Sequence, residues 1–244
     1  MGKIGVISDV HGNIIALRAI LEYFDDNGCD EIIHTGDVVD IGPRSRECLE
    51  LLLSRGDVTL ILGNHDRDFA LNEYRAQKLS HVPAEHKLQV FGTMDDNLRD
   101  KVKCFPLYVT RACGSDTLLF THYALADNTI DGYPFLSIAT EPSAQAFDEM
   151  FVNWQCNAVF FGHKHEPCDI TGDKLYVDVG SVGCYPEPFA RGIIIDYDDK
   201  SWSYTRVSVP YDMESTRRQM DGIVAGKQLY DFYFLRRTPK EEIK

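Results

Sequence analysis

Five short polar motifs in this chain carry side chains that bind metal ions in many proteins, and each follows an apolar run of residues. Their donors are carboxylates, imidazoles and an amide, which suit borderline or hard divalent ions better than Cu(I) or an iron–sulfur cluster. Strands of an open α/β sheet would bring such side chains to one edge although they are far apart in sequence. The pattern therefore predicts a two-metal hydrolytic site. The motifs are Asp9-Val10-His11, Gly36-Asp37, Gly63-Asn64-His65, Thr121-His122 and Gly162-His163-Lys164-His165.

The apolar runs before these motifs have the length and composition of buried β-strands. They are short and rich in β-branched or aromatic residues, as expected for strands covered on both faces. Helical patterns at 13–27 and 44–55 separate the first three runs. This alternation predicts crossover units in a mainly parallel sheet. The runs are Lys3–Ser8, Glu31–Thr35, Val58–Leu62, Thr117–Thr121 and Ala158–Phe161.

The second half of the chain has a different pattern. Strand-like runs at 174–179, 192–197 and 202–209 follow one another without a long helical pattern between them. We expect antiparallel strands here, added to the first sheet or to a second sheet packed on it. The architecture we favour is a two-sheet sandwich flanked by helices, a four-layer α/β/β/α fold.

Length and composition favour one soluble domain. The chain has 244 residues, 44% of them hydrophobic, and shows no linker, repeat or low-complexity tract. We expect a single domain over 1–244 with a flexible C-terminal tail over about 236–244. No apolar run approaches the roughly 20 residues that span a bilayer, and the N-terminus lacks the pattern of a signal peptide. We therefore expect no membrane partner and no processing.

The cysteines and the net charge indicate the cellular compartment and the kinds of partner. Seven scattered cysteines without a C-x-x-C pair predict a reducing cytoplasm and no disulfide framework. Cys168 and Cys184 lie near the motifs in sequence, and we interpret them as buried apolar residues although a ligand role is the alternative. The net charge of -13 disfavours nucleic acid as a partner, because duplex binding needs clustered Lys and Arg.

The ligand types indicate a reaction class. In two-metal hydrolases the ions lie about 3.5–4 Å apart, activate a water to hydroxide and hold the attacking and leaving oxygens of an in-line displacement. Phosphoester hydrolysis is the reaction that this arrangement serves best. We expect two divalent ions, Mn, Fe, Zn or Ni, with Mn favoured.

The order of the motifs carries a family resemblance. The series D-x-H, G-D-x-x-D, G-N-H-D, H and G-H-x-H resembles the calcineurin-like metallophosphoesterase superfamily over most of the chain. The later stretches 180–183 and 190–192 look like its small bacterial and archaeal branch. The resemblance implies that His65 is the general acid and that Asp40 orients its imidazole. It also implies the metal ligands: Asp9, His11 and His165 for one ion, Asn64, His122 and His163 for the other, and Asp37 bridging both.

One position departs from the protein-phosphatase branch of this superfamily. That branch has an arginine after the second Asp of G-D-x-x-D, where it grips a phosphomonoester, and this chain has Ile41. Candidates to replace this arginine are Arg44, Arg46 and Arg67. Of these, we predict Arg44 or Arg67 as the substrate-binding residue. The loop from Ala124 to Pro142 is long enough to overhang the metals, and its aromatic side chains could stack on a base, although we prefer a packing role.

The function we predict is hydrolysis of small phosphodiesters or nucleotides by in-line attack of a metal-bound hydroxide. The alternatives are a phosphomonoesterase or protein Ser/Thr phosphatase, and a dinucleoside polyphosphate hydrolase. A non-catalytic scaffold is disfavoured because all the implied ligands and His65 are present. A nuclease is disfavoured by the acidity of the chain. For His34, His81 and His86, outside the motifs, we expect ordinary surface or hydrogen-bonded core roles.

Overall fold

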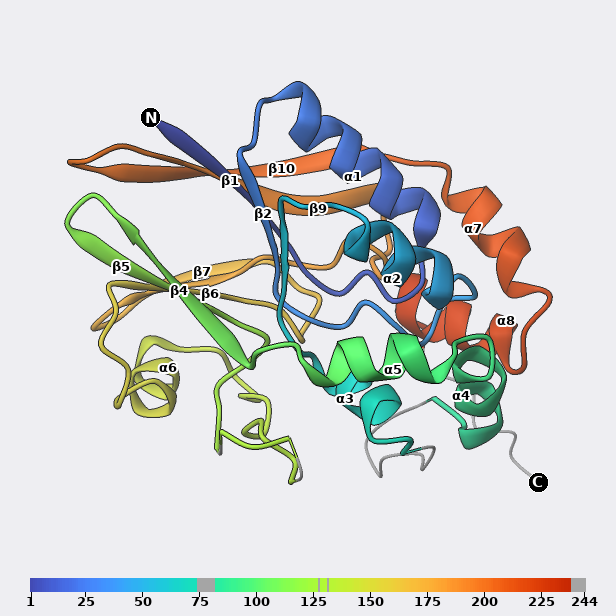
Figure 1. The fold of residues 1–244 in the computed structure, drawn as a ribbon. Coiled ribbons are helices and arrows are strands. Elements are labelled where there is room, and N and C mark those ends of the chain that lie inside the picture. The colour runs from blue at the N-terminus through green and yellow to red at the C-terminus, as the bar shows by residue number, and fades with distance from the viewer. Residues whose placement is uncertain (74–81, 127, 131, 238–244) are drawn as a thin grey trace.

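Two five-stranded β-sheets packed on each other and flanked by helices form the protein (Figure 1). This computed structural model describes residues 1–73, 82–126, 128–130 and 132–237. The predicted two-sheet sandwich with outer helices is confirmed. His81 and residues 238–244 of the expected tail lie outside the described residues.

The first sheet has the order β10-β9-β1-β2-β3. Its strands β1, β2 and β3 are parallel, so their carboxyl ends share one edge. The two late strands extend the sheet antiparallel beside β1, as expected for 192–197 and 202–209. The bounds are β1 Gly2–Ile7, β2 Glu31–His34, β3 Val58–Leu60, β9 Phe189–Tyr197 and β10 Trp202–Pro210.

The second sheet has the order β4-β5-β6-β8-β7 and a parallel centre. The expectation of an antiparallel strand at 174–179 is only half right, because β8 pairs antiparallel with β7 but parallel with β6. The short strand β7 reverses the chain between β6 and β8, so no helix is needed for the crossover. The bounds are β4 Tyr108–Cys113, β5 Asp116–Thr121, β6 Ala158–Phe161, β7 Cys168–Thr171 and β8 Leu175–Asp178.

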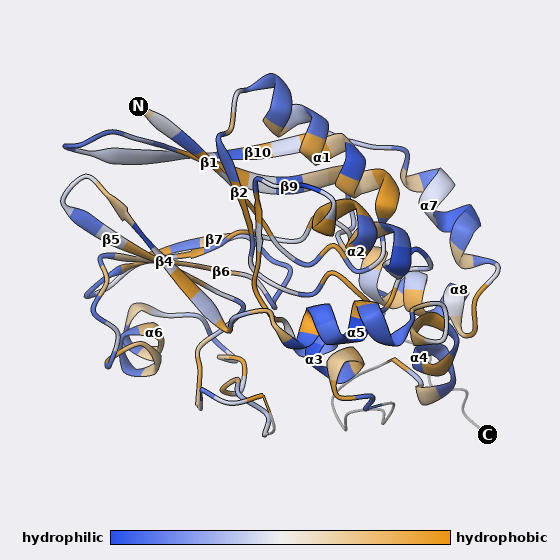
Figure 2. Ribbon diagram, viewed as in Figure 1, coloured by the Kyte–Doolittle hydropathy of each residue, from blue (hydrophilic) through white to orange (hydrophobic). Residues whose placement is uncertain are grey.

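The space between the sheets is an apolar core. Val6 and Ile193 from the first sheet pack with Phe120 and Phe160 from the second in one buried cluster. The rings of Phe120 and Phe160 stack with centroids 5.3 Å apart. Figure 2 shows this segregation, with hydrophobic colour along the strands and hydrophilic colour on much of the helical surface. Because apolar burial is non-directional, side-chain shape and the strand register set how the two sheets pack.

Helices cover the outer faces and the site end of the sheets. Helix α1 begins after Asn13, whose side chain accepts from the Ala16 amide as an N-cap, and packs on β9 and β10. Helix α6 places Phe147 on Phe161 and Tyr176 of the second sheet. The helices are α1 Ile14–Asp26, α2 Ser45–Leu53, α3 Asn64–Ala70, α4 Ala84–Phe91, α5 Asp96–Lys103, α6 Ala144–Met150, α7 Met213–Met220, α8 Gly226–Leu229 and the π-helix η1 Tyr230–Phe234.

The C-terminal helices form a cap that the sequence pattern did not predict. Leu229 of α8 and Tyr230 and Phe234 of η1 form a third buried cluster with Ile41 and Cys184. This cap holds the loop after β2 against the loop after β8. Among the described residues, no helix combines the length and hydropathy that crossing a bilayer requires.

Candidate active site

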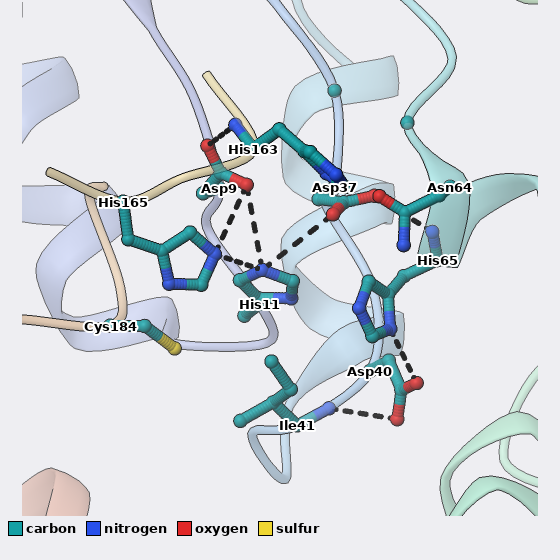
Figure 3. Close-up of polar contacts among 12 residues, drawn as sticks. Asp9, His11, Asp37, Asp40, Ile41, Asn64, His65, His163, His165 and Cys184 are labelled. Atoms are coloured by element: carbon teal, nitrogen blue, oxygen red, sulfur yellow. Dashed lines mark hydrogen bonds and ion pairs between the residues drawn. The ribbon is translucent and has the colours of Figure 1, made fainter. Parts of the chain in front are cut away.

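The five polar motifs meet at the site end of the two sheets, and Figure 3 labels residues of all of them except the His122 motif. Asp9 and His11 follow β1, Asp37 follows β2, and Asn64 opens α3 shortly after β3. His122 follows β5 of the second sheet, and the loop after β6 carries His163 and His165. Parallel neighbours end at the same edge, so the topology itself brings these side chains together.

A first cluster consists of Asp9, His11 and His165, all buried. The Nε2 atoms of His11 and His165 lie 3.0 Å apart. Asp9 Oδ1 lies 3.6 Å from His11 Nε2 and 3.3 Å from His165 Nε2. Asp9 Oδ2 accepts the His163 amide at 2.9 Å, which ties the loops of the two sheets together.

A second cluster consists of Asn64, His122 and His163. His122 Nε2 lies 3.0 Å from Asn64 Oδ1 and 3.0 Å from His163 Nδ1. The ring of Phe135 packs edge-on against the His122 ring, with centroids 5.3 Å apart, and forms an apolar border of this cluster.

Asp37 lies between the two clusters. Its Oδ2 is 3.3 Å from His122 Nε2 and 3.8 Å from His11 Nε2. Its Oδ1 accepts the His65 amide at 2.8 Å. One carboxylate oxygen therefore faces both clusters, as a bridging ligand must.

Backbone carbonyls fix which imidazole nitrogens are free. His11 Nδ1 lies 3.2 Å from the Val39 carbonyl oxygen, and His122 Nδ1 lies 3.0 Å from the Thr35 carbonyl oxygen. Each Nδ1–H donates to its carbonyl, so in the neutral ring the lone pair is on Nε2. Asp9 Oδ1 is buried, and no group in the described part of the chain donates a hydrogen bond to it. These converging lone pairs fit divalent cations.

The electrostatics also favour positive charge here. Burial would raise the pKa of Asp37, but the charges of His122 and His65 lower it well below its usual range. Burial lowers the pKa of His122, but the charge of Asp37 outweighs this effect and raises it to about 9. Burial, together with the charge of His122, lowers the pKa of His163 to about 3, which leaves its lone pair available. A bound cation can take the place of the proton that Asp37 attracts.

The backbone of the site is strained. Non-glycine residues with positive φ are uncommon and persist only where surrounding contacts hold them. Several residues named above adopt this conformation: Asp9 at 52°, His11 at 46°, Asp37 at 63°, Asp40 at 75°, His163 at 74° and His165 at 63°. The protein maintains unfavourable backbone geometry so that these side chains converge.

Two glycines allow the loops to approach closely. A Cβ at Gly63 would lie 2.1 Å from Asp37 Oδ1, and a Cβ at Gly162 would lie 1.9 Å from Ser8 Oγ. Any side chain at either position would displace a neighbour. Both glycines are therefore required for the placement of the carboxylates beside them.

Asp66 is a site residue to which the sequence analysis assigned no role. Its buried carboxylate accepts the backbone amides of Asp37 at 2.8 Å, Val38 at 2.9 Å, Val39 at 3.2 Å and Gly63 at 3.2 Å. Burial and the charge of Asp37 raise the pKa of Asp66 to about 6, while these amides favour its ionised form. Asp66 thus holds the loop that carries Asp37 against the start of α3. Its place in the G-N-H-D motif was the available signal.

His65 and Asp40 form a pair at the border of the site. His65 Nδ1 lies 2.7 Å from Asp40 Oδ2, and the His65 ring is edge-on to the His11 ring at 4.9 Å. Burial would raise the pKa of Asp40, but the hydrogen bond from His65 lowers it to about 2. Burial would lower the pKa of His65, but the charges of Asp37 and Asp40 raise it.

Among the described residues, the arginine candidates contact acidic side chains and backbone carbonyls outside the two donor clusters. Arg44 pairs with Glu47 at 3.2 Å on the surface, and Arg46 pairs with Glu50 at 2.8 Å. Arg67 is buried, and its Nε donates to the carbonyls of Ile130 at 2.9 Å and Gly132 at 2.8 Å. Arg67 therefore anchors the long loop to α3.

The residues around this site explain two further sequence features. Ile41 is fully buried in the C-terminal cap, where a guanidinium would displace apolar packing. Cys184 is buried in the same cluster, and burial raises the pKa of its thiol, as expected for an apolar packing role. Phe135 in the loop over 124–142 and Tyr123 just before this loop are buried packing residues, whereas Tyr133 is 44% exposed.

Comparison with known sequences gives matches over most of the chain and local matches over about a quarter of it. The model of the calcineurin-like phosphoesterase superfamily domain matches residues 2–200. An uncharacterised protein of Methanocaldococcus jannaschii is 25% identical over 230 residues, which cover 86% of this chain and 88% of that protein. A symmetrical bis(5'-nucleosyl)-tetraphosphatase of Klebsiella pneumoniae is 48% identical over 65 residues, which cover 25% of this chain and only 22% of that enzyme.

Solved structures show the same fold. A metallophosphoesterase from Sphaerobacter thermophilus aligns with a TM-score of 0.70 and 22% identity, over 90% of this chain and 93% of that one. A hypothetical protein from Pyrococcus horikoshii OT3 aligns with a TM-score of 0.77 and 16% identity, over 96% of this chain and 98% of that one. At these identities the likeness concerns the fold.

The role of Asp66 gives a prediction about metal affinity. Asp66→Asn replaces one acceptor oxygen by an amide donor facing backbone N–H groups, so the Asp37 loop should shift. We expect the affinity for Mn²⁺, measured by competition with a chelator, to fall about 10- to 100-fold, the range for residues that orient ligands. Asp96→Asn is the matched control, because the Asp96 side chain is 92% exposed. An unchanged affinity in the Asp66 variant would show that the carboxylate does not organise the site.

Proposed function

The chain belongs to the calcineurin-like phosphoesterase superfamily, and we propose that it hydrolyses small phosphodiesters or nucleotides with two divalent metal ions. Membership of this family identifies the protein as a metal-dependent phosphoesterase. The observation that carries the finer proposal is the position of Asp37, whose Oδ2 faces two donor clusters. His65, in the first turn of α3, lies beside them, and its amide donates to Asp37 Oδ1.

We assign the residues that would hold the ions by their clusters. Asp9, His11 and His165 would hold one ion, Asn64, His122 and His163 the other, and Asp37 both. Bound there, two ions supply an activated water and electrostatic stabilisation of the transferred phosphoryl group. Mixed oxygen and nitrogen donors fit Mn, Fe, Zn or Ni, and we favour Mn among these ions.

His65 would supply the proton to the leaving oxygen. Its Nδ1–H donates to the Asp40 carboxylate, which orients the ring and leaves Nε2 as the proton donor. Because the negative charges of Asp37 and Asp40 raise the pKa of His65, the ring keeps its proton toward higher pH. The side chain is 11% exposed, so a leaving group can reach it.

The surroundings support a diester or nucleotide over a phosphomonoester. A monoester carries more charge and is gripped well by a guanidinium, whereas Ile41 is buried under the C-terminal cap. Tyr133 offers a half-exposed ring, with its centroid 5.8 Å from that of Phe135. A nucleobase could stack there.

The seven free cysteines support a reducing compartment such as the cytoplasm.

A second candidate is hydrolysis of dinucleoside polyphosphates. The observation that favours it is the local similarity to a symmetrical bis(5'-nucleosyl)-tetraphosphatase. The same donor clusters would serve a phosphoanhydride, because the attacked centre is again a phosphorus atom. The two candidates differ in leaving group, and a substrate panel separates them.

The test of this function uses protein stripped of metal by a chelator. We expect no activity in the stripped protein and recovery with Mn²⁺. The restored protein should prefer bis(p-nitrophenyl) phosphate over p-nitrophenyl phosphate, with diadenosine tetraphosphate and a phosphopeptide as the other substrates. A strong preference for the tetraphosphate would select the second candidate. Selective phosphopeptide hydrolysis, or activity that survives full removal of metal, would refute the proposal.

The assigned role of His65 predicts a leaving-group effect. His65→Ala should retain both metals, because His65 is not assigned as a ligand, and should lose about 10²–10⁴ in rate. The loss should be smaller for a p-nitrophenyl ester than for a phenyl ester, because nitrophenolate needs less protonation. Elemental analysis and kcat for both esters measure this. Loss of metal, or equal losses for the two esters, would place His65 in another role.

A further inference from the structure

A buried lysine and a buried histidine lie behind the His65–Asp40 pair. Both belong to α4, a helix outside all five motifs, and both side chains have no solvent exposure. Lys87 Nζ lies 3.8 Å from Asp40 Oδ2, and His86 Nε2 lies 3.5 Å from Asp40 Oδ1. Asp40 Oδ2 is the same atom that contacts His65 Nδ1.

Lys87 links two carboxylates. Its Nζ donates to Asp68 Oδ2 on α3, and Asp68 Oδ1 lies 3.6 Å from Arg67 Nη1. Asp40 and Asp68 are both buried, so each would repel the other without a cation between them. The ammonium of Lys87 occupies that position and connects α3, α4 and the loop after β2.

Burying a lysine is expensive, and this cost indicates a specific role. A buried ion pair often contributes little to stability compared with apolar residues of similar volume, although removal of one partner is harmful. An apolar side chain such as methionine could fill the volume of Lys87. The charge is placed behind the proposed general acid, where the direction of a carboxylate matters most.

Several contacts hold the Asp40 carboxylate and its strained backbone in place. Asp40 and Ile41 are consecutive residues with φ of 75° and 60°, a strained backbone that would relax if the surroundings allowed it. The Ile41 amide donates to Asp40 Oδ1 at 2.8 Å, and the Asp40 amide donates to Ser45 Oγ at 3.0 Å. His86 Nδ1 donates to the Val224 carbonyl at 2.9 Å and so is itself fixed beside Asp40. Lys87 supplies the charged contact in this set.

We propose that Lys87 is a positioning residue for the reaction, acting through Asp40 to hold the His65 imidazole in line with the leaving group. This inference rests on the proposed function. Lys87 touches neither the donor clusters nor a substrate. Its contribution is the placement of the Asp40 carboxylate, which in turn sets the direction of His65 Nε2.

The test compares Lys87→Met with Lys87→Arg in the Mn²⁺-loaded protein. Methionine keeps an unbranched side chain without charge, and arginine keeps the charge. The substrates are methyl p-nitrophenyl phosphate and methyl phenyl phosphate, which differ in leaving group. Lys103→Met is the control, because its side chain is 43% exposed and pairs only with Asp100 among the described residues.

We expect Lys87→Met to keep both metals and to leave KM nearly unchanged. Its kcat should fall about 10-fold or more for the phenyl ester, the range for residues that orient a functional group, and much less for the p-nitrophenyl ester. Lys87→Arg should recover most of the loss. Lys103→Met should behave as the parent protein. Equal losses for the two esters, loss of metal, or no loss would overturn the positioning role.

Coupling to His65 gives the sharpest readout. In a His65→Ala background, Lys87→Met should cause no further loss of kcat for the phenyl ester, because the group it positions is gone. A purely structural contribution would slow both backgrounds equally and would refute the proposal.

A folding defect or a failure of the proposed function can be distinguished from a failure of the Lys87 inference. If Lys87→Met does not fold, the double variant Asp68→Asn/Lys87→Met also removes the Asp68 charge, so the Asp68 carboxylate is not left buried without its ammonium partner. The same leaving-group pattern is expected from it, and its absence would count against the proposal. If the parent protein hydrolyses no ester in the panel, the proposed function and this inference both fail. An active parent with an unaffected Lys87 variant refutes the inference alone.

Discussion

The buried carboxylate of Asp37 lies among imidazole nitrogens whose lone pairs also point inward, and positive charge must balance this concentration of donors. The paired nitrogens of His11 with His165, and of His122 with His163, are 3.0 Å apart. Much of the surrounding structure serves to hold them there. The strained φ angles, the glycines that allow close approach and the four amides gathered by Asp66 all act on the loops that carry these donors.

The two sheets provide the frame for this arrangement. Each has a parallel centre, so each delivers side chains to one edge, and the apolar core between them fixes how the edges face each other. Hydrogen bonds join the edges directly: for example, the His163 amide donates to Asp9, and His122 donates to the Thr35 carbonyl. Neither sheet alone carries a complete donor set. Packing between the sheets is therefore a condition for both clusters.

Residue pattern predicted much of this fold and the convergence of the motifs. Strands that lead into polar motifs were visible because both signals are local, and helices such as α1 show their apolar period directly. The C-terminal cap was not predicted, because its helices are short and their burial depends on Ile41 and Cys184, far away in sequence. Lys87 was missed for the same reason: a lysine in an amphipathic helix looks like a surface residue until its partners Asp40 and Asp68 are known. Arg67, a candidate for substrate binding, proved to bind loop carbonyls.

The central claim is that Asp37 bridges two metal ions. Anomalous diffraction at the manganese edge, from crystals of the protein loaded with Mn²⁺, tests it most directly. The account predicts two peaks about 3.5–4 Å apart, one in each donor cluster and both in contact with the Asp37 carboxylate. A single peak, or two peaks of which only one contacts Asp37, would contradict it.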